Sequence, residues 1–328
     1  MNRQTDMKKE IEEEVGVALE GVVTEARGAS YLVSASDGKN YRCRTIAGTQ
    51  TENIDASLVS VGDRVRFKES GESGEAHPQG VITHVGKRFS SLERKRDVRR
   101  NRSKEKKQVI ASNIELLVIV VAAFEPPLST RLIDRYLVFA ESENLPVVIV
   151  VNKMDLDDDD EIPALMAPYT LLGYTVILVS VRQKRGLEEL DQLLSGKVSA
   201  MSGHSGVGKS SIINVLTGQK RMKTARTSYK NGKGVHTTSN AVMLPLISGG
   251  YLIDTPGIRE FSLSGISREQ LRFYFREFLQ FMPECSYSSC SHTVEPGCRV
   301  RGAVEEGLVD PDRYESYLVL YDGLESEQ

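Results

Sequence analysis

The sequence lacks tryptophan altogether, has only four cysteines, and contains no apolar run of membrane-spanning length. A membrane span needs about 18 continuous apolar residues, and the longest run here, Leu116 to Phe124, has about half that length. Three of the four cysteines crowd into residues 285–298, which disfavours a disulfide-stapled secreted domain. The first residues, MNRQTDMKKEIEEEVG, have no apolar core of the kind that a secretory signal needs. We therefore expect a cytoplasmic protein.

The composition is that of an ordinary globular protein, with 40% hydrophobic and 27% charged residues. A length of 328 residues predicts two or three domains. The net charge of -3 conceals a strong local asymmetry, because eleven lysines and arginines between residues 87 and 107 face only three acidic residues. This basic stretch divides the chain into regions of different character.

The N-terminal region has the alternation of β-strands. Residues 1–14 are nearly all polar or charged, and we expect a flexible tail or a short exposed helix there. Residues 15–88 hold five short alternating segments separated by turn-prone residues, which predicts a small β-barrel. An OB-fold and an SH3-like barrel both fit this spacing, and the OB-fold is our first choice.

Residues 89–112 are predicted to form a basic linker after the barrel. Such a segment is often only a solvated connection. Because it follows an OB-fold, a common platform for single-stranded nucleic acid, we expect it to contact RNA instead. The predicted phosphate contacts are Arg94, Arg96, Arg99, Arg100 and Arg102.

Residues 113–265 alternate continuous Val/Ile/Leu runs with amphipathic segments, the pattern of a parallel sheet covered by helices on both faces. We expect a central α/β domain here. Residues 266–328 are predicted to form a small α-helical domain that begins with a Phe-rich helix, LRFYFREFLQF, whose rings pack into a core.

A phosphate-binding motif, GxxxxGK[ST], lies in the α/β region. Its glycines let the backbone wrap a phosphate chain, Lys209 reaches the β and γ phosphates, and Ser210 ligates magnesium. The alternative is a glycine-rich turn that caps a helix. The predicted nucleotide contacts are Gly203, His204, Ser205, Gly206, Val207, Gly208, Lys209, Ser210 and Ser211.

A second motif, Asn152-Lys153-Met154-Asp155, directly follows the apolar run VVIVV. A carboxylate at this strand end can accept both N–H groups along the edge of guanine, whereas adenine would leave Asp155 unpaired. Ser180, which ends TVILVS, is predicted to add a backbone contact to the guanine oxygen. The alternative is an ordinary turn, which Asn and Asp favour.

A third motif, Asp254-Thr255-Pro256-Gly257, follows the strand-like YLI. It suits a second magnesium contact from Asp254 and a γ-phosphate contact from Gly257, although it also resembles an ordinary strand exit. All three motifs fall at carboxyl ends of predicted strands, where open α/β sheets bind ligands. The guanine motif precedes the phosphate loop in the chain, which indicates a circular permutation of the usual order.

A metal site is predicted in the C-terminal region from Cys285-x4-Cys290-x-His292-x5-Cys298. Three thiolates and one imidazole are the composition of a closed structural zinc site. A disulfide among these cysteines is the alternative, and it is weak in a cytoplasmic protein.

Together these motifs resemble the bacterial ribosome-small-subunit-dependent GTPase A (RsgA) family of circularly permuted GTPases. The resemblance rests on NKMD, GHSGVGKSS, GVHTTS, DTPGIRE and the Cys/His cluster, in that order. It implies an N-terminal OB-fold, a permuted GTPase domain and a C-terminal zinc domain that act in late maturation of the small ribosomal subunit. The chain departs from the family pattern at His204, where Gln is commoner, and at Glu115, where Asp is commoner.

The catalytic water needs a residue of its own, because Ile258 stands where Ras-like enzymes place a water-orienting Gln. We expect slow intrinsic hydrolysis for that reason. The segment GVHTTS lies where the first switch loop belongs, and it predicts His236 as the residue that orients the water and Thr238 as the magnesium-sensing residue. Thr237 is the alternative to Thr238, and His236 otherwise anchors the loop or contacts the ribosome.

The predicted function is that of a GTPase that binds the small (30S) subunit, contacts its rRNA, and is stimulated by the subunit. Its cofactors are GTP or GDP, Mg²⁺ held by Ser210, Thr238 and Asp254, and one structural Zn²⁺. We expect no membrane or DNA partner, and a monomer off the ribosome. One alternative is an ATPase or small-molecule kinase, which Asp155 disfavours. The other is a non-catalytic GTP-dependent RNA-binding switch.

Overall fold

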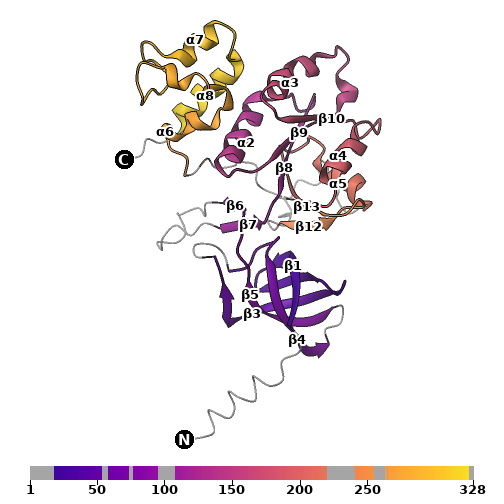
Figure 1. Cartoon of the computed structure of the whole chain (residues 1–328). Coiled ribbons are helices and arrows are strands. Elements are labelled where there is room, and N and C mark those ends of the chain that lie inside the picture. Colours follow the sequence, from indigo (N-terminus) through magenta and orange to yellow (C-terminus); the bar gives the residue numbers. More distant parts are fainter. Residues whose placement is uncertain are drawn as a thin grey trace, which may run out of the picture. The chain divides into compact units, whose positions relative to one another are not determined.

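The computed structural model describes residues 18–53, 58–73, 77–94, 108–219, 241–254, 263 and 265–324 (Figure 1). The chain forms two compact units. The first comprises Met1–Ile114, Val235–Leu244 and Tyr251–Pro256, and the second comprises Glu115–Gly234, Pro245–Gly250 and Gly257–Gln328. The predicted tail at residues 1–14 lies outside the described residues.

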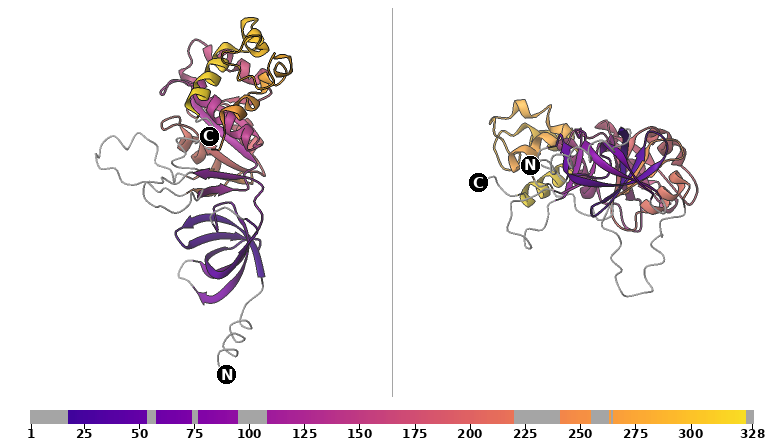
Figure 2. Two further views of the ribbon diagram at one scale, coloured as in Figure 1. Left: turned by 90° about the vertical axis from the view of Figure 1, so that its left-hand side faces the viewer. Right: turned by 90° about the horizontal axis from the view of Figure 1, so that it is seen from below.

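A five-stranded barrel dominates the first unit (Figure 2). Its strands are β1 Ala18–Arg27, β2 Ser30–Ala35, β3 Asn40–Thr51, β4 Arg64–Ser73 and β5 Pro78–Val85. The strands follow the order β1-β2-β3-β5-β4, and antiparallel pairing of β1 with β4 closes the barrel. The parallel pairing of β3 with β5 departs from simple chain order and is that of an OB-fold, so the first choice is confirmed and the SH3-like barrel is excluded.

Alternation along the strands explains the barrel core, since residues at every second position point inward. Val23, Val33, Phe67 and Ile82 are fully buried there. Cys43 is buried among them, and burial raises the pKa of its thiol to about 12. Cys43 is therefore a core residue.

Two further strand pairs belong to the first unit. Strands β6 Ser91–Arg94 and β7 Gln108–Ser112 pair antiparallel, so the segment predicted as a plain linker carries strands at both of its ends. Leu92 of β6 and Ala111 of β7 are fully buried, so each strand packs into the first unit through an apolar position. Strand β12, Val242–Pro245, pairs antiparallel with β1, and β13, Tyr251–Asp254, follows it in the chain.

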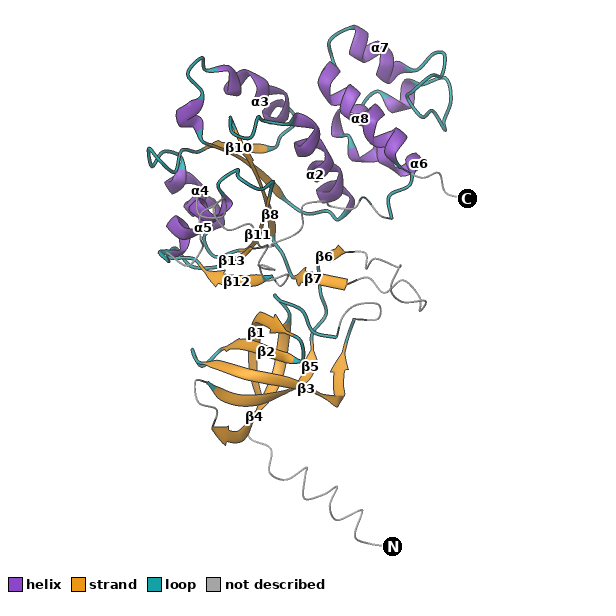
Figure 3. Ribbon diagram, turned by 180° about the vertical axis from the view of Figure 1, so that it is seen from behind, coloured by secondary structure: helices purple, strands orange, loops and turns teal. Residues whose placement is uncertain are grey.

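The second unit contains the predicted parallel sheet, in the order β10-β9-β8-β11. Its strands are β8 Leu116–Ala122, β9 Val147–Asn152, β10 Thr175–Leu178 and β11 Val198–Ser202. All seven residues of β8 are buried, as its continuous apolar sequence predicts. Helices α2 Thr130–Ser142 and α3 Glu161–Leu171 lie on one face, with α4 Leu187–Leu194 and α5 Lys209–Thr217 on the other (Figures 1 and 3).

The C-terminal part of this unit is helical and short-segmented (Figure 3). Its helices are α6 Arg268–Leu271, α7 Arg299–Glu305 and α8 Pro311–Gly323. The predicted Phe-rich helix is wrong, because the chain leaves helical geometry at Phe275, with φ -104° and ψ 99°, and continues in 3-10 turns. This break lets Phe275 and Phe278 stack at 5.2 Å while both rings meet Tyr317 edge-on, an arrangement that a single helical stripe does not offer.

Helix α8 is joined to α2 by a buried ion network. Arg313 Nη1 donates to Asp134 Oδ1 at 2.6 Å, and its Nε and Nη2 donate to the two oxygens of Glu277 at 2.7 and 3.0 Å. Tyr169 of α3 also donates its hydroxyl to Asp134, at 2.8 Å. Helices α2 and α3 beside the sheet thus share one hydrogen-bonded network with α8 and the 3-10 turn Arg276–Phe278 of the C-terminal part. Within the described residues, no helix is long and apolar enough to cross a membrane.

Candidate nucleotide and zinc sites

The loop between β11 and α5 has a backbone that requires glycine. Gly203, Gly206 and Gly208 have φ values of 152°, 88° and 96°. A Cβ on Gly203 would lie 2.1 Å from the carbonyl oxygen of Val120, and one on Gly208 would lie 2.2 Å from Nδ2 of Asn152. The glycines therefore allow the loop to lie directly against β8 and β9 at the start of α5, and a helix N-terminus is where phosphate groups commonly bind.

The lysine and serine of the motif begin α5. Lys209 Nζ donates to the carbonyl oxygens of Gly203 at 2.5 Å and His204 at 2.7 Å, so the ammonium lies inside the curl of the loop. Ser210 follows in the first turn and is partly exposed, as is Ser211. Ser205 is exposed, and Val207 is buried against the sheet. This arrangement fits a phosphate chain, because a cation and a helix N-terminus meet at one place.

One hydrogen bond joins the guanine motif to the phosphate loop. Asn152, at the end of β9, is 2% exposed, and its Nδ2 donates to the carbonyl oxygen of Val207 at 2.9 Å. Lys153 adopts φ 64° and donates its Nζ to the carbonyl oxygen of Glu125, in the loop after β8. Two motifs about fifty residues apart in the chain are thereby brought together.

Asp155 lies in a 3-10 turn, Met154–Leu156, directly after these residues. Ser180 Oγ donates to its Oδ1 at 2.6 Å, while Arg182 Nη1 lies 3.6 Å from its Oδ2. The Asp155 side chain is 9% exposed and that of Arg182 is 81% exposed. The serine was predicted only as a backbone contact, so its side-chain role was missed, as were Arg182 and Glu125. The sequence could have indicated both residues, because Arg182 lies two positions after Ser180 and Glu125 lies in the loop directly after β8.

Of the remaining residues predicted for the nucleotide and RNA sites, the structure describes only two, Asp254 and Arg94. Asp254 ends β13 in the first unit and is partly exposed. His236, Thr237, Thr238, Gly257 and Ile258 lie outside the described residues, as do Arg96, Arg99, Arg100 and Arg102 of the basic segment. Arg94 ends β6. The structure therefore leaves the roles of these residues as predictions.

The four predicted zinc ligands form one cluster. The donor atoms of Cys285, Cys290, His292 and Cys298 all lie within 4.8 Å of one another. The Nδ1 of His292 lies 3.4 Å from Cys298 Sγ and 3.7 Å from Cys285 Sγ, so this nitrogen faces the thiols. All four cysteines of the chain are free, which argues against the disulfide alternative. Three sulfurs and one nitrogen at this separation fit a closed tetrahedral zinc site.

Burial controls the protonation of this cluster. It lowers the pKa of His292 to about 4, so the imidazole is neutral at neutral pH, as a metal ligand must be. It also raises the pKa of Cys290 to about 12 and raises the pKa of Cys298. Zinc must therefore displace protons from thiols when it binds, and its affinity increases with pH.

Helix α8 holds the chain around the cluster from outside. Tyr314 donates its hydroxyl to the carbonyl oxygen of His292 at 2.8 Å, and Tyr317 donates to that of Ser291 at 2.5 Å. Arg272 Nη1 donates to the carbonyl oxygen of Cys290 at 2.7 Å. Sequence reasoning missed all three residues, because no local spacing marks a side chain that supports backbone carbonyls across the fold.

Comparisons with known proteins place the chain in a family. The family model described as RsgA GTPase matches residues 91–264. A protein of Chlorobaculum parvum named small ribosomal subunit biogenesis GTPase RsgA is 56% identical over 307 residues, which cover 94% of this chain and 98% of that protein.

Solved structures agree with this assignment. YjeQ from Thermotoga maritima, 31% identical, covers 95% of this chain and 100% of its own with a TM-score of 0.72. YloQ, a circularly permuted GTPase, is 25% identical, with 95% of both chains covered and a TM-score of 0.69. The permuted order inferred from the motifs is thereby confirmed. This chain belongs to the RsgA GTPase family and is a GTP hydrolase of circularly permuted fold.

Proposed function

We propose that this GTPase acts in biogenesis of the small ribosomal subunit, binding the subunit through its rRNA and hydrolysing GTP faster when bound. The names of the relatives support the partner. The observation that supports the site is the hydrogen bond from Asn152 to Val207, because it holds the guanine-reading turn and the phosphate loop in one place. Action on ribosomal subunits also implies a cytoplasmic location.

The guanine end of the site is assigned to Asp155. Ser180 donates to Oδ1 and so fixes the carboxylate, which leaves its remaining lone pairs for the two N–H groups of guanine. Arg182, exposed and 3.6 Å away, is a loose partner that a base can displace. Adenine has no such donor pair, and this difference supports GTP over ATP.

The phosphate end is assigned to the loop 203–208 and to Lys209. Ser210, Thr238 and Asp254 are the residues that would hold Mg²⁺, which neutralises the charge that develops on the phosphates. Gly257 would contribute a backbone N–H to the γ-phosphate. His236 would orient the attacking water, since Ile258 carries no hydrogen-bonding group for that task.

The zinc cluster is assigned a structural role, because its four protein ligands complete the coordination of the metal. The barrel and the basic arginines are assigned to rRNA. Their charge supports a contact to phosphates that orients the protein and carries no base specificity. We further propose that the chain is a monomer away from the ribosome.

The test is phosphate release from GTP by the purified chain alone, with small subunits, and with large subunits. We expect stimulation by small subunits only. A His236→Ala variant should lose about 100-fold of the stimulated rate while its GDP affinity stays unchanged. His77→Ala is the matched control, since His77 lies before β5 in the barrel. Equal stimulation by both subunits, or by neither, would overturn the proposed partner.

A further inference from the structure

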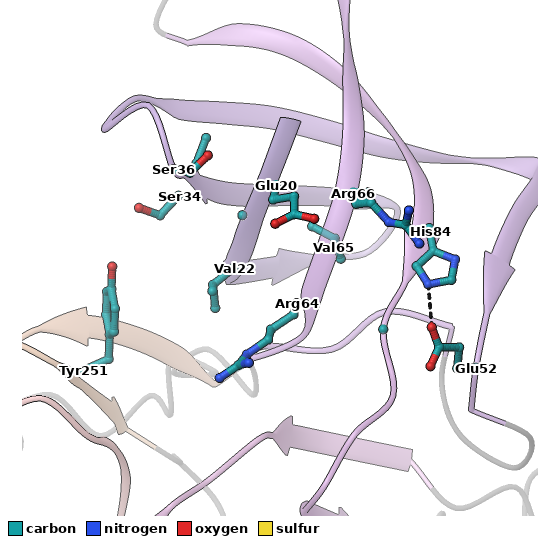
Figure 4. A pocket seen from close by; sticks show the side chains of 13 residues that line it. Glu20, Val22, Ser34, Ser36, Glu52, Arg64, Val65, Arg66, His84 and Tyr251 are labelled. Atoms are coloured by element: carbon teal, nitrogen blue, oxygen red, sulfur yellow. Dashed lines mark hydrogen bonds and ion pairs between the residues drawn. The ribbon is translucent and has the colours of Figure 1, made fainter. Parts of the chain in front are cut away.

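A groove of about 560 Å³ lies on the outer surface of the barrel, within the first unit (Figure 4). Its volume falls in the range of pockets that bind small molecules or single nucleotides. Strands β1, β2 and β4 supply most of its lining, β5 adds His84, and Tyr251 of β13 supplies an aromatic ring. The groove is therefore made by two parts of the chain that are far apart in sequence.

The register of the barrel places two arginines in this groove. Val22 faces Arg64 and Glu20 faces Arg66 across the β1–β4 pair. Arg64 and Arg66 lie two positions apart and point outward, because the intervening Val65 is 3% exposed and points into the core. The strand thus presents two guanidinium groups on one face.

These guanidinium groups are available to a ligand. Among the described residues, neither the Arg64 nor the Arg66 side chain has a hydrogen bond or an ion pair, whereas His84 Nε2 lies 2.8 Å from Glu52 Oε1. Glu20 stands opposite Arg66 in register and offsets part of its charge. Arg64 lies opposite the apolar Val22 instead, so no acidic residue faces it across the β1–β4 pair.

The lining is divided by chemistry along the groove. Tyr251 lies at one end with Ser34 and Ser36, while Arg66, His84 and Glu52 lie at the other, with Val22 and Arg64 between them (Figure 4). An aromatic ring beside an apolar side chain accepts the face of a base. A guanidinium group beside them binds a phosphate in a bidentate manner.

We propose that this groove binds one nucleotide of single-stranded RNA, with its base against Tyr251 and its phosphate on Arg64. The inference rests on the proposed function in that the RNA is the rRNA of the small subunit. The groove lies mainly on the β1–β4 side of the barrel, and the end of β2 at Ser34 and Ala35 also lines it. OB-folds commonly bind oligonucleotides on the face of strands 2 and 3, so the groove extends from the edge of that face onto β1 and β4.

The position of Tyr251 gives this site a link to the nucleotide motifs. Tyr251 begins β13 and Asp254 ends it, and the two residues between them, Leu252 and Ile253, are fully buried. A buried strand transmits displacement along its axis because its side chains are packed on both sides. A nucleotide seated on Tyr251 accordingly contacts the strand that carries Asp254.

The absence of tryptophan makes a direct test possible. A Tyr251→Trp variant keeps a stacking ring and places the sole indole of the chain in the groove. With the protein saturated with GDP, a single-stranded oligoribonucleotide of about ten nucleotides should quench this fluorescence. Phe89→Trp is the control, because Phe89 is 60% exposed and does not line the groove. Quenching of both variants alike, or of neither, would overturn the proposal.

Charge-removing variants locate the phosphate. Arg64→Gln should weaken binding of the oligoribonucleotide and reduce the slope of log affinity against log salt by about 0.7. Arg44→Gln removes the same charge from β3, outside the groove, and should leave affinity within about twofold. An equal loss in both variants would assign the RNA to general electrostatics or to the other face.

Two further measurements distinguish failure of the groove proposal from failure of the proposed function. Quenching of the Tyr251→Trp variant by AMP at the same nucleotide concentration would assign the groove to a free nucleotide and reject RNA. Stimulation of GTP hydrolysis by small subunits, measured on the same preparation, reports the proposed function independently. Normal stimulation without quenching would reject the groove alone, whereas quenching without stimulation would reject the ribosomal function and retain the site.

Discussion

Two charged clusters in the second unit differ in how deeply they are buried and in how firmly their charges are paired. Arg313 is bound by Asp134 and Glu277, and all three side chains are at most 5% exposed. Asp155 instead has one firm donor in Ser180 and one loose partner in Arg182, whose side chain is 81% exposed. Burial closes the first cluster to a ligand, whereas the second has carboxylate lone pairs beside an exposed side chain.

A buried charge needs firm partners on all sides, whereas a charge that is to bind a ligand needs a partner that can be displaced. Burial opposes the charge of Arg313, but Asp134 and Glu277 outweigh it and raise the pKa of the guanidinium, which stays charged. Removing one member would leave the others buried and unpaired. Asp155 and Arg182 can exchange partners with little penalty, because the Arg182 side chain remains in solvent.

The largest expected effect comes from the metal cluster that α8 supports. Cys290→Ser, or removal of zinc by a chelator, should lower the free energy of unfolding of the C-terminal region by about 5 kcal/mol or more. Zinc content and thermal unfolding measure this effect. Retention should also fall as the pH is lowered, because burial raises the thiol pKa of Cys290 to about 12 and protons then compete with the metal.

Cys43→Ser is the control for that change, since Cys43 lies in the barrel core and outside the metal cluster. It should leave zinc content unchanged. A Cys290→Ser protein with full zinc content and unaltered unfolding would contradict the structural assignment.

The next largest effect is expected from a substitution in the buried cluster of Arg313, Asp134 and Glu277. Arg313→Met should destabilise the protein by about 3–5 kcal/mol, because Asp134 and Glu277 would remain buried without a cation. Urea unfolding measures it. Arg131→Ala removes an ion pair to Glu315 on the same two helices, with both side chains more than half exposed, and should change stability by at most about 1 kcal/mol. Similar losses in the two variants would remove the distinction between the clusters.

Asp155→Asn should change nucleotide affinity and leave stability nearly unchanged. GDP affinity should fall by about 30-fold or more, because the amide presents a donor to a base edge made of donors. Xanthosine diphosphate, whose edge has one donor and one acceptor, should be bound better than by the unmodified chain. Competition binding measures both, and urea unfolding should stay within about 0.5 kcal/mol. A variant that loses stability and keeps its preference for guanine would refute the assignment.

The smallest effect is expected at the loose partner. Arg182→Ala should change GDP affinity by at most about fivefold, because an exposed pair at 3.6 Å contributes about 1 kcal/mol at most. The change should vanish at high salt, where exposed charges are screened. Arg185→Ala, in the same loop, serves as the control. A loss of a hundredfold would show that Arg182 contacts the nucleotide strongly.

The sequence singled out Asn152, Asp155 and the loop 203–208, but it gave no signal of the buried cluster of Arg313, Asp134 and Glu277, and the reason is spacing. Motifs such as GxxxxGK[ST] and the Cys/His run need particular residues a few positions apart, so a local pattern reports them. Asp134 and Arg313 are 179 residues apart, and neither position carries a local signal. Only packing of α8 on α2 reveals that they are partners.

The spacing of apolar residues predicted secondary structure only where burial follows from the local sequence. The continuous apolar runs of β8 and β9 predicted the parallel sheet, because such strands are buried on both faces. The Phe-rich segment showed helical spacing, yet Phe275 and Phe278 pack through a bend at Phe275, and Phe273 is 49% exposed. Strands β6 and β7 were also missed, because they have only four and five residues and the burial of Leu92 and Ala111 depends on tertiary contacts.

The most direct measurement is equilibrium competition of GDP and ADP for the labelled-GDP site of the full chain. If Asp155 and the phosphate loop form one guanine site through Asn152, GDP should compete better than ADP by about a thousandfold or more, since adenine leaves a fixed carboxylate unpaired. Equal competition by the two nucleotides would show that Asp155 does not distinguish guanine from adenine, and it would contradict the assignment of this carboxylate to the base.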